Sequence, residues 1–176
     1  MHSRETIRET FVKLIKKAKT SAGENVFNMR DFNFFLEKMP AINVSTQSES
    51  IDETYQHDYG MRRRVLTVDV ECYATGDDGA RFVDELASTV EDIFHVHPNL
   101  KNTVETCRLQ NIAMAFGDNG SVALHGSILT FEVTYVTHIP HPEEAAETLK
   151  TLFVGLDPET GRGNEDKYQK IGNIHA

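Results

Sequence analysis

One alternating stretch, residues 62–74, constrains the fold of this chain more than any other. Within it, apolar side chains occupy every second position: Leu66, Val68, Val70, Cys72 and Ala74. Polar side chains and one tyrosine fill the positions between: Thr67, Asp69, Glu71 and Tyr73. A period of two residues is typical of a β-strand with one buried face. We therefore predict a strand whose apolar face must be covered by another element.

A helix that could cover this strand is predicted directly after it, over residues 80–94. Residues 76–79, GDDG, end the strand with a turn. The segment that follows carries apolar residues at helical spacing: Val83, Leu86, Ala87, Val90, Ile93 and Phe94. This spacing places the six side chains along one side of a helix.

A second amphipathic helix is predicted at the N-terminus, over residues 3–19. Its apolar positions are Ile7, Phe11, Leu14, Ile15 and Ala18. The interpretation we favour is a helix that covers a sheet. The alternative, a basic helix lying on a membrane, would require a wider apolar face without acids such as Glu5 and Glu9.

Further strands are predicted from shorter patterns. They lie at 26–29, directly after Pro40, at 103–116 and at 121–137, and a hairpin turn at 117–120 joins the last two. The apolar parity of the last strand changes near Gly126, which predicts a bulge or bend there. Residues 31–38 contain three phenylalanines and are expected to be partly buried. Residues 47–60 are polar and acidic, which predicts a long loop or a hairpin arm.

The C-terminal part has a different composition. Residues 143–153 are predicted to form a short helix with Leu149, Leu152 and Phe153, and residues 156–176 are rich in turn formers. Together these patterns predict an α+β fold, with a mixed or antiparallel sheet and two helices packed on it. We expect a core over residues 1–138 and a C-terminal arm over 139–176.

Composition excludes several classes of protein. An apolar content of 39% is sufficient for a packed core. The formal net charge of −9 argues against a protein that wraps nucleic acid. No apolar run reaches the roughly 20 residues that span a bilayer, and the charged N-terminus does not resemble a signal peptide. We therefore expect a protein made and assembled in a cytoplasm, without a membrane partner.

No catalytic residues and no cofactor are predicted. The glycines do not form a phosphate-binding loop, and no serine lies in a nucleophile elbow. Arg62, Arg63 and Arg64 are read as the solvated start of a strand, in preference to a phosphate site. Cys72 and Cys107 are expected to be reduced and buried, and a disulfide between them would require their strands to pair in register.

Two histidine pairs are the weak candidates for a metal site. They are His95 with His97, and His138 with His141. Because each pair lies at the end of an element beside prolines, we interpret them as exposed loop histidines and predict no metal.

Several strings and their order resemble the tail terminator proteins of long-tailed bacteriophages, the family that includes the minor tail protein U of lambdoid phages. After an N-terminal amphipathic helix come MPAINV at 39–44 and RRVLTVDVECYATGDDG at 63–79. FVDELASTVEDIF at 82–94 and SILTFEVTYVT at 127–137 complete the pattern, which covers residues 1–138. The cysteine pair and the long C-terminal arm depart from the family pattern.

The resemblance implies a structural protein of the virion with no enzymatic activity and no cofactor. Such a subunit closes into a hexameric ring at the neck end of the tail. The ring caps the tail tube, stops its polymerisation and forms the joining surface for the head-completion complex, and for the sheath in contractile tails. Genome DNA passes through the lumen without specific binding.

The predicted contact residues follow from this ring. Acids in and near the 47–60 segment are the first candidates for the channel surface, because excess acid repels the duplex. The candidates for the channel or for contacts between subunits are Glu49, Asp52, Glu53, Asp58, Arg62 and Arg63. In the arm, the candidates for docking on a neighbouring protein are Leu149, Leu152, Phe153 and Tyr168.

Three other readings stay open at this stage. The first is another neck or tail-completion protein of the head–tail connector. The second is an enzyme that uses the histidine pairs to bind a metal. The third is a monomeric ligand-binding α+β domain.

Overall fold

A computed structural model describes residues 3–29, 38–57, 60–118, 123–138, 151–154 and 169–173. The chain divides into two compact units, Met1–Ile139 and Pro140–Ala176. The sequence predicts that residues 31–38 are partly buried. Apart from Lys38, these residues lie outside the described ones. Among the described residues, no helix is long and apolar enough to cross a membrane.

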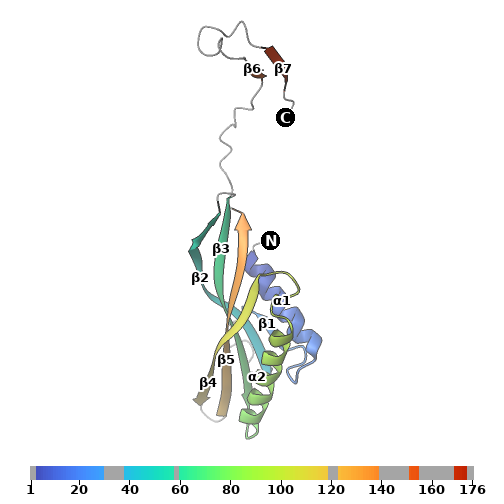
Figure 1. Cartoon of the computed structure of the whole chain (residues 1–176). Helices are drawn as coiled ribbons and strands as arrows, with labels where there is room; N and C mark the ends of the chain where they lie inside the picture. The colour runs from blue at the N-terminus through green and yellow to red at the C-terminus, as the bar shows by residue number, and fades with distance from the viewer. Residues whose placement is uncertain are drawn as a thin grey trace. The chain divides into compact units, whose positions relative to one another are not determined.

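The first unit is an α+β fold built on one five-stranded sheet (Figure 1). In the order in which they lie side by side, its strands are β1 (Val26–Asn28), β2 (Ala41–His57), β3 (Met61–Thr75), β5 (Ala123–His138) and β4 (Thr106–Asp118). β1 and β2 are parallel and all other neighbours are antiparallel. The sheet is therefore mixed, which is one of the two alternatives that the sequence predicts.

Both helices, α1 (Ser3–Ala18) and α2 (Gly79–Val96), pack on the same face of the sheet (Figure 1). α1 contacts β1 and β2, and α2 contacts β3, β5 and β4. The five alternating apolar residues of β3 are all buried, which confirms the predicted strand. Four of the five apolar positions predicted for the N-terminal helix are buried, and the fifth, Ala18, is exposed at the end of α1.

Three aromatic rings join the two helices to the sheet. Phe11 of α1 stacks on Phe94 of α2 with 4.3 Å between ring centroids. Phe131 of β5 meets both edge to face, at 5.6 Å from Phe11 and 4.9 Å from Phe94. All three are buried. Edge-to-face and stacked pairs of this kind add to the free energy gained by burying the rings.

The 47–60 segment is a hairpin arm and not a loop. β2 continues to His57 and pairs with β3 up to His57↔Met61. The pairing register shifts after Thr46 and again after Ile51, so the arm is an irregular extension of the sheet. Polar residues form a strand here because β3 supplies hydrogen-bonding partners for their backbone. The strand therefore forms without an alternating apolar face.

Of the bulge or bend predicted near Gly126, the bulge is wrong, since β5 pairs with β3 without interruption from Leu124 to His138. The parity of apolar residues changes there because His125 lies against the start of α2. A Cβ atom on Gly79 would come within 2.4 Å of the His125 ring, so only glycine permits this approach. The irregularity lies instead in β4, between Leu109 and Asn111.

The second unit contains a two-stranded antiparallel sheet, β6 (Thr151–Val154) and β7 (Gln169–Asn173). The predicted helix over 143–153 is therefore wrong for Leu152 and Phe153, which lie in β6. Because the run Thr-Leu-Phe-Val combines β-branched and aromatic residues, strand formation is its intrinsic preference. Leu149 and Tyr168 lie outside the described residues.

Candidate assembly surface

A network of charged side chains holds the base of the β2–β3 arm. Glu49 of β2 accepts a hydrogen bond from Nη1 of Arg64 at 2.7 Å and one from the hydroxyl of Tyr135. Arg64 also donates through Nε to Oγ1 of Thr137, at 2.9 Å. Arg4 of α1 lies 3.9 Å from the Glu49 carboxylate. The network thus ties α1 to three strands.

Burial and charge act in opposite directions on Glu49. Its side chain is only 11% exposed, and burial alone would raise its pKa. The hydrogen bond from Tyr135 and the charges of Arg64 and Arg4 outweigh burial and hold the pKa of Glu49 below its ordinary value. Burial, followed by the hydrogen bond to Glu49, raises the pKa of Tyr135. Glu49 is therefore ionised and Tyr135 neutral at physiological pH.

Arg63 forms a second link on the opposite face of β3. Its Nε donates to Oε2 of Glu105 at 2.8 Å, and its Nη1 lies 3.8 Å from Oδ2 of Asp52. These side chains are about one third exposed, so solvent screens the pairs. The structure thus brings Asp52 and Arg63 together across the arm. Arg62 lies beside them, opposite Gln56 and Thr137.

The predicted channel acids are only partly described. Glu49 and Asp52 each pair with an arginine of the same subunit. Glu53 lies in β2, but its side chain is not described, and Asp58 lies outside the described residues. A channel role for the four acids stays a prediction.

The histidines do not assemble into a described metal site. His95 is exposed in the last turn of α2, His97 follows that helix, and His138 is exposed at the end of β5. His141 lies outside the described residues. In the ranges that the structure describes, no three His, Cys, Asp or Glu residues form a group that could hold a metal ion.

Both cysteines are free and buried. β5 lies between the strands that carry Cys72 and Cys107, so the strands do not pair with each other. Two strand spacings separate their backbones by roughly 10 Å, which is too far for a disulfide. Burial raises the pKa of both thiols to about 12, so neither is a reactive nucleophile near neutral pH.

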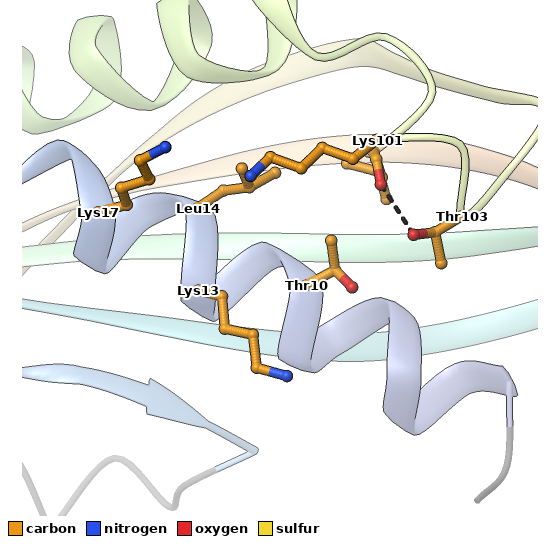
Figure 2. A pocket seen from close by; sticks show the side chains of 7 residues that line it. Thr10, Lys13, Leu14, Lys17, Lys101 and Thr103 are labelled. Carbon is orange, nitrogen blue, oxygen red and sulfur yellow. Dashed lines mark hydrogen bonds between the residues drawn. The ribbon is translucent and has the colours of Figure 1, made fainter.

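A hollow of about 310 Å³ lies between α1 and the loop that connects α2 to β4 (Figure 2). Lys13, Lys17 and Lys101 line it together with Thr10 and Thr103. Figure 2 shows the side chain of Lys101 extended toward Leu14 and that of Lys13 directed away from it. Lys13 also pairs with Glu9, at 3.4 Å. The three ammonium groups therefore do not converge on one point.

The outer border of β4 is the feature that the sequence patterns did not reveal. In the described part of the chain, no strand pairs with the edge of β4 that faces away from β5. Ile112 and Met114 point toward the helix side of the sheet but are 39% and 53% exposed. Residues 111–117, NIAMAFG, contain no charge and no proline, which are the usual protections of a free strand edge.

Comparison with family models and with curated proteins does not add to this description. No family model and no curated protein matches the chain. Among the described residues, the charged base of the arm and the apolar border of β4 are the surfaces suited to contact with another protein.

Proposed function

We propose that this protein is a phage tail terminator: a structural ring subunit that caps the tail tube, stops its polymerisation and presents the joining surface for the neck complex. One observation carries the proposal. The four strings that resemble the family fold next to one another in one unit, as the start of β2, as β3 with its turn, as α2 and as β5. The α+β subunit has the elements that the resemblance implies.

The described surfaces suit assembly better than chemistry. A free, uncharged strand edge is a template for association with another chain. The charged arm extends the sheet past the start of α1 (Figure 1). We propose that acids of the arm other than Glu49, which is nearly buried in its pair with Arg64, contribute to a channel that DNA crosses without adhering.

Electron microscopy of the purified protein with and without tail tubes tests the proposal. We expect rings at one end of each tube, and tubes that no longer elongate when tube protein is added. A protein found at the portal side would instead be another component of the head–tail connector. A protein that ignores tubes and stays monomeric would contradict the proposal.

Deletion of residues 143–176 is expected to leave a folded subunit that assembles poorly. The second unit is compact by itself, and an isolated two-stranded sheet is at best marginally stable, so it is suited to docking on another protein. Circular dichroism would measure folding, and sedimentation with tail tubes would measure assembly. An insoluble truncated protein would show instead that residues 143–176 belong to the core.

A further inference from the structure

The middle of β4 is open along its outer border. Residues 111–114 are all exposed, and because successive side chains of a strand point to opposite faces, neither face of the sheet is covered there. From Asn111 onward, β4 pairs with β5 without interruption. Within the part of the chain that the structure describes, the backbone of 111–117 bonds only to β5. The start of β4 differs, since the N–H of Cys107 donates to the carbonyl oxygen of Pro98.

The sequence of this border is complementary to itself. The uncharged run from Leu109 to Gly117 is centred on Ala113, with Arg108 before it and Asp118 after it. An antiparallel copy of the strand with the same centre would bring the Arg108 end of each copy beside the Asp118 end of the other. A parallel copy in register would bring like charges together, which destabilises a strand pair. The charges therefore favour a second copy in the antiparallel direction.

The same centre pairs the exposed apolar side chains with one another. With Ala113 opposite Ala113 of the second copy, Ile112 of each copy lies opposite Met114 of the other. Both side chains point to the helix side of the sheet, where they are 39% and 53% exposed. Apolar cross-strand pairs stabilise a sheet. The pairing would also remove from water an apolar edge that otherwise promotes aggregation.

We propose that β4 binds β4 of a second copy of this chain as an antiparallel pair centred on Ala113, so that the two five-stranded sheets become one continuous sheet. The contact is two-fold symmetric, because it uses the same border of both copies, and it therefore closes as a dimer. It goes beyond the tail terminator function, since it forms without a tail tube and uses none of the residues of the arm.

A single engineered cysteine tests the proposed centre. Position 113 is its own partner in the dimer, and the Cα atoms of directly opposed residues in an antiparallel pair are roughly 4.5–5.5 Å apart, within the reach of a disulfide. We expect Ala113→Cys to form a covalent dimer on mild oxidation, seen in non-reducing denaturing gels. Val96→Cys is the matched control at an exposed position outside β4, and it should give none. Cys72 and Cys107 should not interfere, because both are buried.

Charges placed at positions 112 and 114 test which residues face each other. Met114→Lys should weaken dimerisation about tenfold or more, measured by sedimentation velocity, because it buries an unpaired ammonium at the contact. Ile112→Glu should weaken it in the same way through an unpaired carboxylate. An equal mixture of the two variants should regain dimers, because each heterodimer places the carboxylate opposite the ammonium. Val96→Lys is the control, since Val96 is 69% exposed at the end of α2 and should leave dimerisation unchanged.

The outcomes separate this contact from the ring function. A wild-type protein that is monomeric in solution at every concentration, yet forms rings on tail tubes, would overturn the contact and leave the ring proposal standing. Dimers that persist in Met114→Lys, or dimers of Ala113→Cys that do not crosslink, would also overturn the contact. Dimers that crosslink as expected but do not cap tail tubes would support the contact and contradict the ring function.

Discussion

Phe131→Ala is expected to lower the free energy of unfolding by about 3–5 kcal/mol, the largest effect that we predict for one side chain. Phe131 is 1% exposed and contacts the rings of Phe11 and Phe94. Its removal would leave a cavity at the point where both helices meet the sheet. Urea unfolding followed by circular dichroism, at one fixed protein concentration, would measure the loss.

Two variants calibrate this result. Phe131→Leu keeps most of the buried volume and should cost clearly less than alanine. Val96→Ala removes an exposed side chain and should change stability by less than about 0.5 kcal/mol. If Phe131→Ala cost less than about 1 kcal/mol, the three rings could not be the packed junction that the structure describes.

The sequence predicts β3, β5 and both helices because one face of each is covered and the other is wet. In β3, the alternation of Val68 and Val70 with Asp69 and Glu71 records this environment residue by residue. In α2, the buried positions recur at helical spacing for the same reason. The periodicity of apolar residues therefore predicts an element correctly where one face of that element is covered.

The arm and β4 follow this pattern only in part, for different physical reasons. In the arm, Glu49 points toward the helix side of the sheet but pairs with Arg64, so an inward position is polar. In β4, the irregularity between Leu109 and Asn111 shifts the inward positions to Ile112 and Met114, which obscures a simple alternation. The local pattern predicts a strand over 103–116 and a loop or hairpin arm over 47–60, but the inward positions within them depend on how neighbouring strands pair.

The candidate surfaces depend on register even more strongly. Arg64 lies opposite Tyr135 on one side and Ile51 on the other, and this placement brings Glu49 within reach of both Arg64 and Tyr135. The sequence identifies Glu49 and the arginine run as residues of interest. It cannot indicate that Arg64 forms the less exposed pair while Arg63 forms the more exposed ones.

Arg64→Met should therefore destabilise the protein by about 2 kcal/mol at pH 7, because it leaves the Glu49 carboxylate, which is 11% exposed, without its closest cation. Arg4 and Tyr135 still contact that carboxylate, so we expect less than the loss of a fully buried pair. Arg63→Met is the matched control, and should cost less than about 1 kcal/mol because its pairs are solvent-screened.

The cost of Arg64→Met should also depend on pH. The network holds the pKa of Glu49 in the folded state below its unfolded value, so its stabilisation is complete above the unfolded pKa and is lost as pH falls through the folded pKa. The difference in the free energy of unfolding between wild type and variant, measured by urea unfolding, should thus be constant from pH 6 to 7, because a carboxyl group ordinarily has a pKa near about 4. It should shrink as the pH falls below about 4.

In a Glu49→Gln background the same arginine change should cost little at any pH, since no carboxylate remains to be left unpaired. A penalty that is equally large in that background, and that does not change with pH, would mean that Arg64 acts through packing of its side chain and not through its charge.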